Sequence, residues 1–163
     1  MHFTDSQLIA LSTIIENKNR FIRSDLIKSM EKPVRTNFSS EIAIPLEKNK
    51  SLLTSKLPKT KQRGRPGSVM RVTSNPWILE DIYQAMNARA DRYAHEVQKC
   101  GDVIDCIEKK RIYFSKYTEW ARRSTLFLVH CLDRGLQFPS PDKTLEDEEW
   151  KEYCDVLYGH KIE

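Results

Sequence analysis

The stretch of sequence that decides the fold is LLTSKLPKTKQRGRPGSVMRVT, residues 52–73. Its two ends, 52–57 and 69–73, are short apolar runs, and the second has β-branched residues at both ends, which is typical of strands. Between them lie two glycines, two prolines and four basic residues without an acid, and this composition is typical of a turn. We therefore expect a β-hairpin with a basic tip.

Upstream of the hairpin, apolar residues recur at the spacing of helices. Thr4 and Gln7 form the pattern of a capping box, which predicts the start of a first helix. Residues 24–25 predict the cap of a second, short helix, and Pro33 predicts its end. A third helical segment ends near Asn49. Three helices followed by a β-hairpin are the order of a winged helix, so the expected fold class is mainly α, with an N-terminal winged helix and an all-helical remainder.

Pro45 falls inside the third helical segment. An interior proline removes one helical hydrogen bond and costs a helix about 3 kcal/mol. We therefore expect this helix to begin late, to kink or to stop early.

Two segments resemble those of a known superfamily. LEKNKSLL, residues 46–53, resembles the end of the recognition helix and the first wing strand of small winged helix-turn-helix transcription regulators. RGRP, residues 63–66, followed by 69–73, resembles the wing and second strand of the same superfamily, which includes PadR-like and MarR-like regulators. The resemblance covers residues 4–75. It implies a recognition helix in the major groove of double-stranded DNA and a basic wing on the backbone or the minor groove.

The resemblance also assigns roles to individual side chains. The candidates for the groove face of the recognition helix are Arg35, Thr36, Asn37, Ser39 and Ser40. Phosphate contacts, which set affinity more than sequence preference, fall to Lys48, Lys50, Lys59 and Lys61. Arg63 and Arg65 lie along the minor groove, with Gly64 between them allowing close approach, and Arg71 completes the predicted DNA-binding set.

RGRP supports a second interpretation as well. These four residues are similar to the core of an AT-hook, a short extended segment that places arginines in A·T-rich minor groove. A wing and a hook predict the same two arginines as DNA contacts. A solvated loop without any DNA contact is the third alternative.

The charge is unevenly distributed along the chain. Residues 1–73 contain 14 Lys/Arg and 6 Asp/Glu, a balance of +8, whereas residues 74–163 contain 13 and 17, a balance of −4. A basic front half of this kind favours a polyanionic partner.

The second half is expected to be all-helical. A helix that starts at the cap of residues 74–77 stops or bends near Gly101, a second one runs over about 116–134, and a last amphipathic helix follows a linker. Homodimerisation is the expected use of their apolar faces, with packing inside one chain as the alternative. The predicted dimer-interface residues are Leu79, Tyr83, Met86, Tyr93, Val97, Leu126 and Phe127. The expected organisation is a DNA-binding domain over residues 1–75, a helical dimerisation domain over 76–138, and a linker with a C-terminal helix over 139–163.

No pattern in the sequence favours catalysis. The four cysteines, at 100, 106, 131 and 154, lack the spacing of a structural zinc site, and the sequence holds no phosphate-binding glycine loop and no nucleophile elbow. We expect no enzyme, no metal and no cofactor. We also expect no secretory signal and no membrane span, and hence a cytoplasmic, nucleoid-associated protein.

Three functions remain open from the sequence. The first is a sequence-specific, dimeric transcription regulator. The second is an architectural DNA binder that prefers A·T-rich minor grooves. The third is a protein-interaction module, such as a phage- or plasmid-type inhibitor or adaptor, which uses the same fold and its acidic C-terminal helix for the contact.

Overall fold

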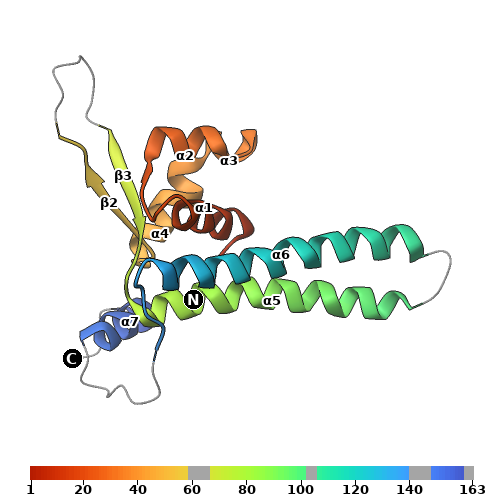
Figure 1. Cartoon of the computed structure of the whole chain (residues 1–163). Helices are drawn as coiled ribbons and strands as arrows, with labels where there is room; N and C mark the ends of the chain where they lie inside the picture. Colours follow the sequence, from red (N-terminus) through yellow and green to blue (C-terminus); the bar gives the residue numbers. More distant parts are fainter. Residues whose placement is uncertain (59–66, 102–105, 140–147, 160–163) are drawn as a thin grey trace.

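The computed structural model describes residues 1–58, 67–101, 106–139 and 148–159 (Figure 1). Their fold is mainly helical with one small antiparallel sheet, as expected. The elements in chain order are α1 (Asp5–Glu16), β1 (Phe21–Ile22), α2 (Arg23–Ser29), α3 (Lys32–Thr36), the π-helical turn η1 (Ser39–Ala43), α4 (Ile44–Lys48), β2 (Leu52–Lys56), β3 (Ser68–Val72), α5 (Pro76–Cys100), α6 (Ile107–Asp133) and α7 (Glu148–Tyr158).

The first helix begins with the predicted capping box. Thr4 Oγ1 accepts a hydrogen bond of 3.2 Å from the Gln7 backbone N–H, and Gln7 Oε1 accepts one of 3.0 Å from the Thr4 N–H. By contrast, the predicted cap at residues 24–25 is wrong. α2 begins at Arg23, directly after the extended residue Ile22, and no side chain caps it.

The sheet has the strand order β1-β3-β2, and both pairings are antiparallel. The predicted hairpin strands are confirmed, with β2 ending at Lys56 and β3 beginning at Ser68. Just before β1 begins, Asn19 extends the contact with β3, since its Oδ1 accepts a bond of 2.7 Å from the Val72 N–H. Leu52, Met70 and Val72 are buried and share one face of the sheet.

The helical segment around Pro45 is continuous, because a π-helical turn lies directly before the proline. In η1 the chain makes a wider turn, and the Ile44 N–H bonds the Ser39 carbonyl five residues earlier. Pro45 has no N–H to donate to the Glu41 carbonyl four residues before it. That carbonyl oxygen instead accepts a bond of 2.9 Å from Gln7 Nε2 on α1.

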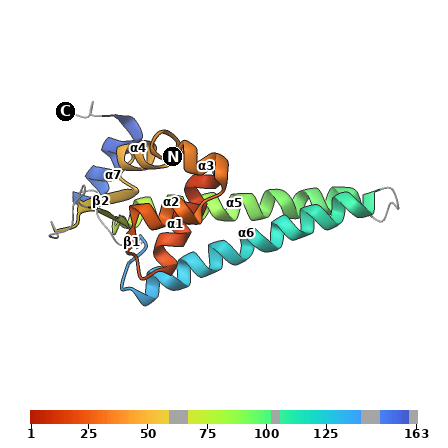
Figure 2. The same ribbon diagram turned by 90° about the horizontal axis from the view of Figure 1, so that it is seen from above.

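α5 and α6 form a long antiparallel hairpin that extends well beyond the rest of the molecule (Figure 2). The Asn75 side chain caps α5, with Pro76 in the first turn, and α5 ends at Gly101, where φ is +53°. α6 is longer than predicted, since it begins at Ile107 rather than near residue 116. After α6, Gly135 has a φ of +74°, and the Leu136 N–H bonds the Cys131 carbonyl at 2.9 Å, which closes the helix as expected.

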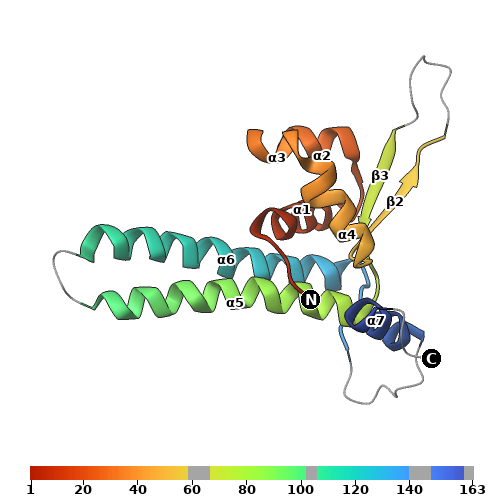
Figure 3. The ribbon, with the colours of Figure 1, turned by 180° about the vertical axis from the view of Figure 1, so that it is seen from behind.

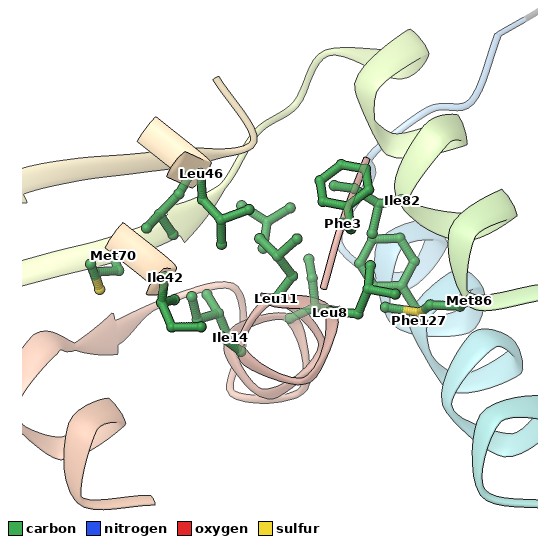
Figure 4. Close-up of a cluster of buried hydrophobic side chains, with 14 of the residues drawn as sticks. Phe3, Leu8, Leu11, Ile14, Ile42, Leu46, Met70, Ile82, Met86 and Phe127 are labelled. Atoms are coloured by element: carbon green, nitrogen blue, oxygen red, sulfur yellow. The ribbon is translucent and has the colours of Figure 1, made fainter. Parts of the chain in front are cut away.

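One hydrophobic core runs through the molecule (Figure 4). Leu8 and Leu11 of α1 lie between Leu46 and Ile42 on one side and the α5–α6 hairpin on the other. The core therefore crosses the predicted boundary at residue 75 without a break. Its labelled members in Figure 4 are Phe3, Leu8, Leu11, Ile14, Ile42, Leu46, Met70, Ile82, Met86 and Phe127.

The last described helix, α7, packs against the start of α5 (Figure 3). The Trp77 and Trp150 rings meet edge to face with centroids 4.5 Å apart. Asn75 Nδ2 donates to the Glu149 carbonyl at 2.9 Å and to Glu152 Oε2 at 2.8 Å. Among the described residues, no helix is long and apolar enough to span a membrane.

Candidate nucleic-acid interface

The predicted groove residues form one exposed segment. Arg35 and Thr36 end α3, Asn37 follows it, and Ser39 and Ser40 begin η1; all five are exposed. Phe38, which is 2% exposed, and Ile42, which is 1% exposed, attach this segment to the hydrophobic core. The structure thus brings the five predicted side chains together on the surface, and the buried side chains of Phe38 and Ile42 hold the segment in place.

Ser39 is fixed by a basic residue that sequence reasoning did not select. Arg23 Nη2 donates a bond of 2.6 Å to Ser39 Oγ, and the Arg23 guanidinium lies over the Phe38 ring, 5.4 Å from its centroid. Both contacts orient the first turn of η1. Arg23 was hidden from sequence analysis because the contact joins segments 16 residues apart.

Ile44 is a second residue that the sequence analysis missed. It is 60% exposed although it is apolar, and it lies at intervals of four residues from the exposed Ser40 and Lys48. The buried apolar positions of this segment are Phe38, Ile42 and Leu46, at intervals of four residues, and Ile44 lies outside that stripe. An exposed aliphatic side chain on a helix can contact the methyl group of thymine.

The β2–β3 hairpin carries an exposed lysine that was not among the predicted DNA contacts. Lys56 is exposed and shares the sheet face of Leu52 and Thr54, the same face that carries the buried core residues. Thr54 Oγ1 donates a bond of 2.7 Å to Glu47 Oε1 of α4, so this face looks toward the helices. Lys56 therefore lies on the side of the hairpin that α4 also occupies.

The remaining predicted DNA contacts differ in their placement. Arg71 is exposed on the opposite face of the hairpin, across from Leu53. Lys48 is exposed, whereas Lys50 forms an ion pair of 3.4 Å with Glu152 of α7. The predicted residues Lys59, Lys61, Arg63, Gly64 and Arg65 lie outside the described residues.

The predicted dimer-interface residues are largely covered within one chain. Leu79 and Met86 are 0% exposed and Phe127 is 1% exposed. Leu79 and Met86 lie on α5, which packs against α6, and Phe127 lies on α6, which also packs against α1. Packing inside one chain therefore accounts for their burial. The other four are half-buried, namely Tyr83, Tyr93, Val97 and Leu126. Of these, Tyr83 contacts Phe138 and Tyr93 contacts Tyr113, with ring centroids 6.0 Å and 6.3 Å apart.

The titratable groups with shifted pKa values lie away from this surface. Burial raises the pKa of the Cys131 thiol to about 12, although the nearby Arg134 lowers it in part. Burial and a hydrogen bond to Asp81 raise the pKa of Tyr153 on α7. Within the described part of the chain, no three His, Cys, Asp or Glu residues gather in a way that would hold a metal ion.

Comparisons with known proteins assign no function to this surface. No protein-family model matches the chain, and neither the curated proteins nor the solved structures contain a significant match.

Proposed function

We propose that the chain is a double-stranded-DNA-binding transcription regulator whose residues 1–75 act as a winged helix. One observation carries the proposal: the exposed face of the helical segment 35–48 lies beside the β2–β3 hairpin, whose Lys56 lies on the same side. The order of α1, α2 and the helical segment of α3, η1 and α4, followed by the β2–β3 hairpin with β1 pairing to β3, supports the same architecture.

In this proposal the segment around η1 reads bases from the major groove. Asn37 and Ser40 offer hydrogen-bonding groups to base edges, and Ile44 offers an apolar surface to a thymine methyl. Lys48 and Lys56 neutralise phosphates on either side of the helix. The hairpin tip with Arg63 and Arg65 follows the backbone or the minor groove.

Two copies of the chain are part of the proposal. A two-fold dimer presents two recognition helices to a palindromic site, which is the usual way in which a small reading surface gains affinity and specificity. Such a protein acts at the nucleoid and needs no cofactor for binding.

The test is fluorescence anisotropy with labelled duplex DNA, titrated at several salt concentrations. Lys56→Ala is compared with Lys99→Ala, which removes the same charge from the exposed end of α5. The proposal expects binding that weakens steeply with salt, and a slope of log affinity against log salt that is smaller by about one in Lys56→Ala only.

Each other outcome identifies a different function. Equal affinity for random and selected A·T-rich duplexes would favour the architectural binder. Absence of salt-sensitive binding by the wild-type chain would exclude both DNA-binding functions and leave the protein-interaction module.

A further inference from the structure

The outward side of α6 carries exposed apolar side chains that nothing in the described part of the chain covers. Among the described residues, nine large hydrophobic side chains are exposed, and five of these lie on α6. Four of the five, Ile107, Phe114, Val129 and Leu132, are 44–58% exposed and fall on one stripe. Exposed apolar surface concentrated on one element marks an interaction site more often than scattered single residues do.

This stripe runs along the whole of α6. At 3.6 residues per turn its members lie within an arc of about 80° around the helix axis. All of them are exposed, and in order they are Ile107, Arg111, Phe114, Thr118, Arg122, Thr125, Val129 and Leu132. The opposite side of α6, with Trp120, Phe127 and Cys131, is buried in the core. We call these eight residues the α6 stripe.

The α6 stripe carries its exposed apolar side chains near both ends, with polar residues between them. Ile107 and Leu132 lie 13 and 12 residues from residue 120, and Arg111 and Val129 each lie nine residues from it. Two copies of α6 that cross antiparallel near residue 120 therefore bring the apolar end of one copy against the apolar end of the other. Ile107 and Phe114 at the tip end of one copy meet Leu132, Val129 and the half-buried Leu126 at the base of the other.

Charge favours the antiparallel arrangement over the parallel one. A parallel pair places Arg111 against Arg111, which is repulsive. In the antiparallel pair the two Arg111 side chains lie toward opposite ends of the pair, and each comes opposite Val129 of the other copy. There Glu16, at the end of α1, lines the same surface groove as Leu126 and His130. Glu16 is exposed, so an arginine from the second copy finds an acid at that place.

We infer that the α6 stripe is the surface on which a second copy of this chain docks, with the two α6 helices antiparallel and crossing near Thr118 and Arg122. The inference deepens the proposed dimer and replaces most of the residues that the sequence suggested for it. It rests on the proposed function only for what the dimer is used for, because neither the docking surface nor its test involves DNA.

The first test is sedimentation velocity over a range of protein concentrations. Phe114→Asp is compared with Ile112→Asp, since the two parent side chains are 58% and 57% exposed on the same helix but Ile112 lies outside the stripe. We expect a wild-type dimer whose dissociation constant rises at least about 30-fold in Phe114→Asp. Ile112→Asp should remain dimeric, and circular dichroism checks that both variants fold.

The second test determines the orientation by cross-linking with a short bismaleimide. Positions 118 of an antiparallel pair are ~6 Å apart along the axis, with helix axes ~8–10 Å apart, whereas the native Cys106 residues are ~42 Å apart. Thr118→Cys should therefore give a cross-linked dimer that the wild-type chain does not give. A parallel pair would cross-link through Cys106 in the wild type.

The outcomes separate the inference from the proposed function. A wild-type chain that is monomeric at all concentrations, or a dimer that Ile112→Asp disrupts and Phe114→Asp does not, overturns the α6 docking surface. A monomer that still binds DNA leaves the proposed DNA binding standing, and a dimer that binds no DNA overturns only the proposed function.

Discussion

The side-chain amide of Gln7 donates a hydrogen bond of 2.9 Å to the backbone carbonyl of Glu41. Glu41 is the residue whose carbonyl Pro45 leaves without its usual helical donor. The same side chain closes the capping box of α1 through its Oε1 atom. One buried glutamine thus joins the start of the first helix to the turn that carries the candidate base contacts.

Gln7→Ala should lower the free energy of unfolding by about 1–3 kcal/mol, because it leaves the Glu41 carbonyl without a donor and opens the capping box. The measurement is urea unfolding followed by circular dichroism. In a Pro45→Ala background, residue 45 has an N–H to donate, so Gln7→Ala should cost clearly less there. Equal costs in both backgrounds would contradict the relationship.

Ile44→Ala should remove discrimination between thymine and uracil. Wild-type affinity for a selected binding site should fall roughly fourfold when the thymine that meets Ile44 is replaced by uracil, since one buried methyl group is worth about 0.8 kcal/mol. The variant should bind both duplexes equally in the anisotropy assay. A wild-type protein that does not distinguish the two duplexes at any thymine of the site would remove Ile44 from the base contacts.

Arg63→Ala combined with Arg65→Ala should weaken DNA binding and lower the salt slope by about two, because two phosphate-neutralising charges are lost. The fold should be unaffected, which thermal unfolding checks. The matched control removes Lys99 and Lys109, two exposed lysines of the α5–α6 hairpin. If the control pair changes the salt slope as much as the arginine pair does, the segment between β2 and β3 has no special role in DNA binding.

Arg89→Met should destabilise the chain by about 2 kcal/mol. The Arg89 guanidinium donates to Asp5 and to the Phe3 carbonyl, and it lies over the Trp120 ring with its carbon 5.4 Å from the centroid. Arg92→Met is the control, since Arg92 is exposed and contacts only the neighbouring Tyr93 ring within the described residues. Its change in unfolding free energy should stay within about 0.5 kcal/mol.

Cys131 should remain unreactive toward thiol reagents at neutral and mildly alkaline pH. Its folded-state pKa of about 12 lies above the ordinary value of 9.0, so the native thiol stays protonated. The stability that this contributes is fully present below pH 9 and is lost as the pH rises toward 12, because only the unfolded chain ionises in that window. Mass spectrometry after alkylation should find Cys131 unmodified until denaturant is added.

The signals that the sequence does carry are local ones. Thr4 with Gln7, Asn75 with Pro76, and Gly135 predicted helix ends correctly, because a cap or a left-handed residue acts on its own turn. The α6 start was missed because Arg111 breaks an apolar pattern without breaking a helix. On an exposed face an arginine costs nothing, and here it also lies 3.9 Å from Glu108 one turn earlier.

What covers an apolar stripe could not be predicted. The spacing of Leu79 and Met86 fits a second chain as well as it fits α6, and only the folded arrangement shows that α6 packs against the helix that carries them. The π-helical turn η1 was likewise not predicted, because no residue pattern indicates such a turn.

Within the described residues, one continuous core joins Phe3 and Leu8 to Phe127. The α5–α6 hairpin and residues 1–75 should therefore move as one rigid body. If two such molecules cross at residue 120 of α6, the length of α6 sets the distance between their two DNA-binding surfaces. Removing one heptad from each arm of the α5–α6 hairpin would shorten that distance, and the preferred spacing between DNA half-sites would change with it.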